Sequence, residues 1–275
     1  MTTLVPAPAT LTSPTETRSL SGRRELGLLA LLYLAYAASR VFASDLAAPA
    51  RERAMRILSL EDLLLLDIER GVVSWFVAHD GVGLLSAYYY AIAHYLVTAV
   101  VLVSLFHSRK LLYPLARLTL VASTVIALVA YLLMPTEPPR LVGFPDLMAR
   151  HSDQGWWGAA ASAPQGLGWM TNQLAAFPSM HAGWSLWVAL AITAATTNRL
   201  LRTAGWAHVL LTAMVVVGTG NHWVVDVLAG WAVVFIVWRT AHGLTSPDET
   251  QHSTGSESSE SVAHQSTVGG RPHRR

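Results

Sequence analysis

Residues 220–238 read GNHWVVDVLAGWAVVFIVW, and this stretch decides how the rest of the chain is interpreted. Its apolar part is typical of a helix that crosses a membrane. A histidine and an aspartate stand four residues apart at its start, which on a helix puts them one turn apart, with about 5–6 Å between Cβ atoms. An aspartate inside a span costs roughly 2.5–3.5 kcal/mol on insertion scales, so we expect Asp226 to have a function. It can hold one imidazole nitrogen of His222 and leave the other free to attack.

The composition is that of an integral membrane protein. Of the 275 residues, 52% are hydrophobic and only 13% are charged, whereas soluble domains carry about 25% charged residues. The formal net charge of +2 says little about partners; we expect the membrane itself and a lipid, and no nucleic acid. The chain has no cysteine, which excludes disulfides, thiolate metal sites and a cysteine nucleophile.

Six apolar runs are close to the roughly 17–25 residues that a membrane span needs. They cover residues 26–43, 82–106, 113–134, 180–197, 204–220 and 222–239. Residues 50–80 carry charges among leucines, which predicts amphipathic helices on the membrane surface; a helical hairpin packed on the bundle is the alternative. The predicted fold is therefore all-α, a polytopic membrane bundle of six transmembrane helices plus amphipathic surface helices.

The two ends of the chain are polar. Residues 1–22 are rich in Thr, Pro and Ser, and residues 241–275 in Ser, Thr, Glu and His. Both are predicted to be disordered tails around a membrane-embedded domain of residues 23–240. A cleavable signal peptide is an alternative for the first apolar run, because Ala35-Tyr36-Ala37 resembles a small-residue cleavage site.

Basic residues near the span ends set the expected orientation. If six spans are drawn, these residues share one side, which is then cytoplasmic and holds both termini. They are Arg23, Arg24, Arg109, Lys110, Arg117, Arg199, Arg202 and Arg239. Arginines of the 50–80 segment go against the rule, but neighbouring acids offset them. The turn before His222 and the loop 135–178 are then expected at the extracytoplasmic face.

Three segments meet at that face. Residues 134–140 (MPTEPPR) end the third span, residues 177–181 (FPSMH) begin the fourth, and residues 221–226 begin the sixth. The prolines stop the third helix and start the fourth. A helix that starts at Pro178 leaves free backbone N–H groups, which suit an anion, and Arg140 can hold a phosphate in a planar, bidentate grip.

These residue types fit phosphoryl transfer. His222 would attack phosphorus and His181 would protonate the leaving oxygen, since an imidazole with a pKa of about 6.5 serves both roles. The His222–Asp226 pair has two other interpretations: a structural polar contact, or a zinc site completed by His181. Ser179 alone suits helix capping, and Arg140 alone suits anchoring at lipid headgroups.

Weaker candidates surround this set. Tyr90 and His94 fall in the outer half of the second span, where an aromatic belt explains tyrosines without any function; His94, as a buried polar group, could bind a substrate headgroup. Asn172 and Gln173, with Asn221 beside the histidine, could supply neutral donors to a phosphate.

The motifs resemble those of the type-2 phosphatidic acid phosphatase superfamily. Pro178-Ser179-Met180-His181 looks like the second signature of that family, and His222 with Asp226 looks like the end of the third. The PTEPPR segment and the Asn-His-Trp-x-x-Asp form are most similar to the branch that contains inositol phosphorylceramide synthases and their actinobacterial relatives. The resemblance covers about residues 55–240.

The resemblance implies a two-step reaction on a lipid phosphate through a phosphohistidine, with no metal and no other cofactor. Carried over by position, His222 is the nucleophile and Asp226 orients it. His181 is the general acid and then the base that activates the acceptor. Ser179 and Arg140 bind phosphate.

Two positions depart from the phosphatase branch. Leu133 stands where that branch has a Lys seven residues before the first-signature Arg, and Val216 stands where it has an Arg six residues before the third-signature His. A dianionic phosphate would need more positive charge than remains, whereas a phosphodiester carries one negative charge and needs less. We therefore expect a phosphotransferase or phosphodiesterase-like activity, with a lipid phosphatase as the other enzymatic outcome.

Two interpretations lie outside enzymes. One is a transporter or lipid-binding protein, but transport sites usually lie near the bilayer midplane, whereas these polar residues cluster at one interface. The other is a non-catalytic relative on an inherited scaffold, which the two lost cations favour. The lipid, the acceptor and the oligomeric state stay open.

Overall fold

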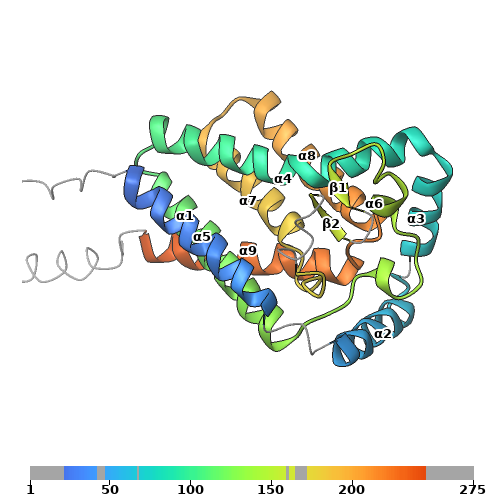
Figure 1. Ribbon diagram of the computed structural model, residues 1–275. Helices are drawn as coiled ribbons and strands as arrows, with labels where there is room; N and C mark the ends of the chain where they lie inside the picture. Colours follow the sequence, from blue (N-terminus) through green and yellow to red (C-terminus); the bar gives the residue numbers. More distant parts are fainter. Residues whose placement is uncertain (1–21, 42–46, 67, 159–160, 165–171, 246–275) are drawn as a thin grey trace, which may run out of the picture.

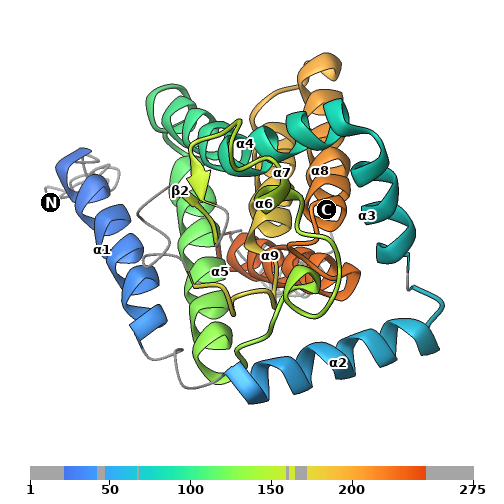
Figure 2. The same ribbon diagram turned by 45° about the vertical axis from the view of Figure 1, so that its right-hand side comes forward.

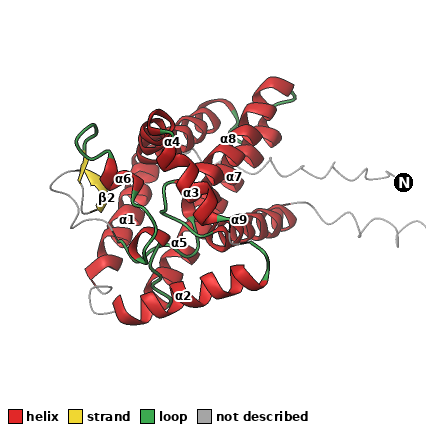
Figure 3. Cartoon of the chain, turned by 90° about the vertical axis from the view of Figure 1, so that its right-hand side faces the viewer, coloured by secondary structure: helices red, strands yellow, loops and turns green. Residues whose placement is uncertain are grey.

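The computed structural model describes residues 22–41, 47–66, 68–158, 161–164 and 172–245 (Figure 1). Its elements are α1 (Gly22–Val41), α2 (Ala47–Leu63), α3 (Glu69–Ala78), α4 (Asp80–Ser108), α5 (Tyr113–Leu133), η2 (Pro139–Leu141), α6 (Leu147–Arg150), β1 (Trp157–Gly158), β2 (Ala161–Pro164), α7 (Met180–Ala195), α8 (Arg199–Gly218) and α9 (Val224–Thr245). Helices dominate the described chain, and β1 and β2 form one short antiparallel pair (Figure 3). The predicted tails lie outside the described residues, except that α1 begins at Gly22 and α9 continues past residue 240.

Four helices of the described chain are long and apolar enough to cross a membrane: α4, α5, α8 and α9. The apolar α7 has 16 residues, which makes it about 24 Å long at 1.5 Å per residue, against about 30 Å for a hydrocarbon core. α1 covers the first predicted run, but it is not among the four. The all-α membrane bundle is thus confirmed, whereas length and composition support four of the six predicted spans.

The central helix is α7, which packs against α4, α5, α8 and α9. Apolar side chains of α4, α5, α7 and α9 form the main core. Trp187 of α7 is fully buried, and its indole N–H donates to the Ala116 carbonyl of α5 at 2.7 Å. Because four helices pack against α7, most of the residues in its first half are buried.

Two glycines let α7 and α9 cross closely. A Cβ on Gly230 would lie 2.0 Å from the carbonyl oxygen of Ser179, and a Cβ on Gly183 would lie 3.1 Å from the carbonyl oxygen of Gly230. The Ser179 N–H also donates to the Asp226 carbonyl at 2.9 Å. The starts of the two helices are therefore fixed against each other by backbone contacts.

The segment predicted to form surface helices packs on the bundle. α2 lies against α9 and α3 against α8, and Figure 2 shows α2 running across one end of the molecule. Each helix buries a glutamate completely, Glu61 on α2 and Glu69 on α3. Leu63, Leu65 and Ile68 are exposed at the junction, so contact of this face with a membrane surface stays a prediction.

The connection from α5 to α7 covers the same end of the bundle as α2 and α3 (Figure 1). Its two ends pair with each other: the Thr136 N–H donates to the Leu174 carbonyl at 2.7 Å, and the Ala176 N–H to the Thr136 carbonyl at 3.3 Å. This pairing matters for the site, because the Ala176 carbonyl points at His222.

Candidate active site

His222 lies in the turn between α8 and α9, and not on a helix. Gly220 adopts a φ of +71°, a left-handed conformation that suits glycine, and the N–H groups of Asn221 and His222 both donate to the Val216 carbonyl. α9 begins only at Val224. The predicted pair one helical turn apart is therefore wrong in its geometry, although the structure does bring His222 and Asp226 together.

The His222 ring is held through its Nδ1 atom. Nδ1 lies 3.0 Å from the Ala176 carbonyl oxygen and 3.5 Å from Asp226 Oδ2. A carbonyl oxygen accepts hydrogen bonds but cannot donate, so Nδ1 carries the proton and Nε2 keeps its lone pair. Asp226 is fully buried, and the same Oδ2 accepts the Trp223 N–H at 2.9 Å. The aspartate thus orients both the ring and the turn.

His181 lies in the first turn of α7 and faces His222. The centroids of the two imidazole rings are 5.4 Å apart. The His181 ring also stacks on Tyr90 of α4, at 4.5 Å and an interplanar angle of 16°. The prediction that imidazoles from the fourth and sixth predicted spans meet at one site matches this arrangement.

Ser179 caps α7. Its fully buried hydroxyl oxygen accepts the Ala182 N–H at 3.4 Å, which is the capping role that the sequence left as an alternative. The hydroxyl hydrogen stays available to a ligand, because capping uses only the oxygen lone pair. The N–H groups of Met180 and His181 have no hydrogen-bond partner among the described residues.

Arg140 packs onto the turn that carries His222. Its backbone N–H donates to the Gly220 carbonyl at 2.9 Å, and its Nε donates to Asn221 Oδ1 at 2.9 Å. Nη1 lies 3.4 Å from Gln173 Oε1 and 3.6 Å from Asp146 Oδ2. The guanidinium group is therefore oriented by three acceptors and belongs to the site, with a side chain that is 4% exposed.

The three amide side chains contact neighbouring protein groups, and their role as donors to a phosphate stays a prediction. We expected donors to phosphate, but the oxygens of Asn221 and Gln173 accept from Arg140, and Asn221 Nδ2 donates to Thr219 at 3.0 Å. Asn172 accepts the Leu174 N–H, and its Nδ2 is buried with no hydrogen-bond partner among the described residues. Of the three, Asn172 keeps an unused donor for a headgroup.

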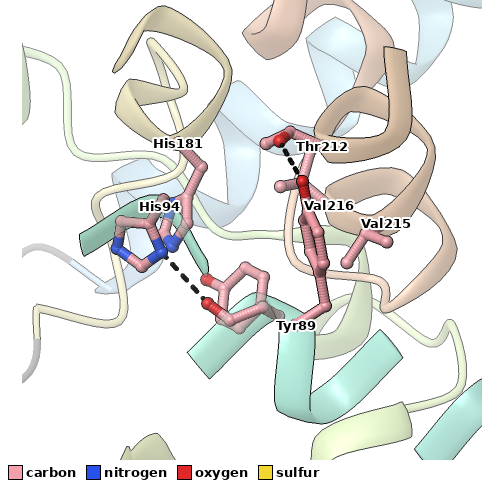
Figure 4. Close-up of a pocket in the computed structure, with 7 residues that line it drawn as sticks. Tyr89, His94, His181, Thr212, Val215 and Val216 are labelled. Atoms are coloured by element: carbon pink, nitrogen blue, oxygen red, sulfur yellow. Dashed lines mark hydrogen bonds between the residues drawn. The ribbon is translucent and has the colours of Figure 1, made fainter. Parts of the chain in front are cut away.

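A small hollow adjoins His181, between α4, α7 and α8 (Figure 4). It is lined by Tyr89, Tyr90, His94, His181, Thr212, Val215 and Val216. His94 Nδ1 donates to the Tyr90 carbonyl at 3.1 Å, and the His94 ring centroid lies 3.9 Å from that of His181. Tyr90 and His94 thus lie beside the acid–base candidate, as their prediction as headgroup residues requires.

The sequence interpretation missed Tyr89. Its hydroxyl lies 2.6 Å from His208 Nδ1 and 3.0 Å from Thr212 Oγ1, so it links α4 to α8 beside the hollow. An aromatic belt explained this tyrosine as well as a polar cluster did, and its partners stand more than a hundred residues away. The sequence therefore gave no signal that separated the two.

Glu61 and Glu69 were also missed. Glu69 Oε1 accepts the Val224 N–H at 2.9 Å, and Glu61 Oε1 accepts the Val225 N–H at 2.8 Å. Burial, with the neighbouring carboxyl groups, raises the pKa of Glu61 to about 9. Two acids from a segment predicted to lie on the membrane surface thus cap the helix that follows His222.

No group of three or more His, Asp or Glu side chains is arranged to hold a metal ion within the described ranges.

Comparison with known proteins gives one result. A family model described as PAP2 superfamily matches residues 55–240. No curated protein and no solved structure matches the chain significantly. The matched range begins in α2 and ends in α9, so it includes every candidate site residue named above.

Proposed function

The chain belongs to the PAP2 superfamily, whose members are generally phosphatases or phosphotransferases, and from this premise we propose that it transfers a phosphoryl group from a membrane lipid through a phosphohistidine at His222. The observation that carries the proposal is the state of that ring. Its Nδ1–H is directed at the Ala176 carbonyl, its Nε2 is unoccupied among the described residues, and His181 faces it at 5.4 Å.

In the first step, Nε2 of His222 forms a bond to phosphorus while the bond from phosphorus to the leaving oxygen breaks. His181 gives its proton to that oxygen. The phosphorylated ring keeps its Nδ1 proton and becomes cationic, so the Asp226 carboxylate at 3.5 Å stabilises it.

In the second step, His181 removes a proton from water or from an alcohol hydroxyl. The oxygen of that acceptor forms a bond to phosphorus, and the bond between phosphorus and Nε2 breaks. Water gives a lipid phosphatase, and an alcohol gives a phosphotransferase. The same pair of histidines serves both outcomes.

The phosphate would be held by Arg140, by the Ser179 hydroxyl and by the free N–H groups at the start of α7. Val216 contributes an apolar side chain to the wall of the hollow beside His181, where the phosphatase branch has an arginine. Leu133 is 73% exposed on α5, so a lysine there would extend away from the site. One guanidinium group suits a monoanionic phosphodiester, which favours transfer and the inositol phosphorylceramide synthase-like branch.

The proposed topology has six spans, namely α1, α4, α5, α7, α8 and α9. The start of α1 and the end of α9 lie at one side of the molecule, whereas α2, α3, α6 and the β-hairpin lie at the other (Figure 1). Arginines and one lysine at the first side support a cytoplasmic assignment. His222 would then act at the extracytoplasmic face. α7 is short for a span, but it packs against α4, α5, α8 and α9, so these helices cover it within the bilayer.

The test is an assay of the full chain in lipid vesicles. Phospholipids labelled with ³²P in the headgroup phosphate, both phosphomonoesters and phosphodiesters, are supplied with and without inositol or glycerol as acceptor. We expect label to move from a phosphodiester to the acceptor or to water in the wild type, and no movement with His222→Gln. Equal turnover by that variant would overturn the mechanism. No turnover by the wild type on any lipid would favour the non-catalytic scaffold that the two lost cations suggest.

A further inference from the structure

Two buried glutamates join α2 and α3 to the start of α9. The amide N–H groups of Val224 and Val225 donate to Glu69 and Glu61, at 2.9 and 2.8 Å, through Oε1 in each case. Both glutamates are completely buried. The first helical residues after the turn of His222 are therefore held by side chains that come from about 160 positions earlier in the chain.

The second oxygen of each carboxyl group, Oε2, indicates the protonation state of the pair. Oε2 of Glu61 and Oε2 of Glu69 are buried and find no hydrogen-bond donor among the described residues. The two carboxyl groups contact each other, and the charged groups that act on Glu61 are Glu69 from α3 and Asp226 from α9. His222 faces Asp226 from the other side. No described lysine or arginine forms an ion pair with either glutamate.

Three ionised carboxylates in this position would repel one another. The free N–H groups at a helix start offer only about half an elementary charge in compensation. Buried charges without partners cost several kcal/mol each, and such groups bind a proton instead. A single proton placed between the two Oε2 atoms gives both of them a partner.

We propose that Glu61 and Glu69 share one proton as a carboxylic acid–carboxylate pair, and that this pair is the positioning device that fixes the turn of His222 for phosphoryl transfer. The positioning part rests on the function proposed above, whereas the shared proton does not. The raised pKa of Glu61, about 9, agrees with a carboxyl group that is protonated at neutral pH.

The pair makes the fold sensitive to alkali. The folded-state pKa of Glu61 is raised above its ordinary value of 4.5, so the folded protein binds this proton more tightly than the unfolded chain does. Its contribution to stability is present at low pH, falls as pH rises from about 4.5, and is lost above about 9. Loss of the proton sets two anions against each other, and the turn of His222 loosens.

Glutamine substitutions test the shared proton. Glu61→Gln keeps an oxygen for the Val225 N–H and offers an N–H₂ donor to Glu69, so it reproduces the protonated state; Glu69→Gln does the same from the other side. The double variant places two donors opposite each other, with no acceptor between them. Glu52→Gln is the matched control, since Glu52 lies on α2 but is exposed and pairs with Arg56.

The readouts are hydrogen–deuterium exchange of residues 219–226 and the infrared band of a protonated carboxyl group, both on the full chain in lipid vesicles. We expect each single variant to exchange within about threefold of the wild type, and the double variant at least about tenfold faster than the product of the single effects, because two buried donors lose their acceptor. The carboxyl band should titrate near pH 9 in the wild type and in Glu52→Gln, and disappear in Glu61→Gln.

Exchange in the double variant that equals the product of the single effects, or a wild-type spectrum without the band, would overturn the shared proton. The wild-type titration needs no substituted chain, so a misfolded variant does not weaken the test. Phosphoryl transfer assayed on the same samples tests positioning: kcat of the wild type should fall above about pH 9, and that of Glu61→Gln should not. An unchanged alkaline limb refutes positioning alone, and an inactive wild type refutes the proposed function while leaving the exchange and infrared results decisive.

Discussion

Helices α7 and α9 meet at the site, but their first N–H groups differ. Those at the start of α9 already have hydrogen-bond partners, so we call this helix end closed. The N–H groups of its first two residues, Val224 and Val225, and of Trp223 just before them each donate to a carboxyl group. These three acids are fully buried and come from α2, α3 and α9 itself. Because protein oxygens already occupy this helix end, it has no room for a phosphate.

The start of α7 is open by comparison. Ser179 takes up the Ala182 N–H, while those of Met180 and His181 have no partner within the described part of the chain. An unoccupied helix start of this kind binds anions well. Under the proposed mechanism, the start of α9 holds the turn of His222, and the start of α7 stays free to bind the phosphate that His222 attacks.

The largest effect is expected from the closed end. His222→Gln removes the nucleophile, so turnover should fall by at least about 10⁴-fold, as losses of nucleophiles do. Covalent ³²P labelling of the protein, quenched in alkali because phosphohistidine is acid-labile, should disappear as well. His107→Gln, at an exposed histidine near the end of α4, should keep both signals. Labelling that persists in His222→Gln would place the covalent intermediate on another residue.

The start of α7 carries the proposed proton donor, His181. His181→Gln should lower turnover of a lipid phosphodiester by about 10²- to 10⁴-fold, since general acids contribute that much. A nitrophenyl phosphodiester needs no proton on its leaving oxygen, so its loss should be much smaller in the first step, and the phosphoenzyme should accumulate. Equal losses with both substrates would mean that His181 is not the acid.

The sequence predicted the helices and the motif residues better than it predicted their connections. Long apolar runs form helices in nearly any membrane bundle, so the bounds of α4 and α5 lie within two residues of the predicted spans and those of α8 and α9 within six. The spacing of His222 and Asp226 predicted a helix, because residues i and i+4 lie on one helix face. The left-handed Gly220 and the two hydrogen bonds from the N–H groups of Asn221 and His222 to the Val216 carbonyl instead form a turn. Spacing alone does not contain that information.

Glu52 and Glu61 illustrate what local pattern cannot give. Both lie on α2, among arginines and leucines. Glu52 is exposed and pairs with Arg56 one turn away, at 2.6 Å, which is the arrangement that the sequence predicts for such a helix. Glu61 is completely buried and accepts from Val225, 164 positions later. Tertiary packing sets this difference, so the local sequence does not show which of the two glutamates is buried.

A smaller effect is expected from the guanidinium group of Arg140, which contacts the turn of His222 through Asn221. Arg140→Lys keeps the charge but loses the planar pair of donors and the bond from Nε to Asn221. We expect kcat/KM to fall about 10- to 100-fold, because hydrogen bonds to charged groups contribute about 1.5–3 kcal/mol. Arg150→Lys, half exposed beside Asp80, is the control. A variant with Arg140→Lys that matches the wild type would leave the arginine as an anchor of the turn.

The smallest effect is expected from the loss of a helix cap, and it compares the start of α7, which would bind phosphate, with the start of α8, which would not. Ser179→Ala and Asn198→Ala each remove a helix cap, at α7 and α8, and each should lower stability by about 0.5–2 kcal/mol. On a chain of this size that is a fall in Tm of a few degrees, roughly 2–4 °C per kcal/mol. Asn198 lies on the opposite end of its helix from the turn of His222, so its loss should leave KM unchanged. The Ser179 hydroxyl can also donate to phosphate, so Ser179→Ala should raise KM several-fold in addition. If both variants change Tm equally and neither changes KM, the serine is a cap and nothing more, and the open end of α7 binds phosphate through its backbone alone.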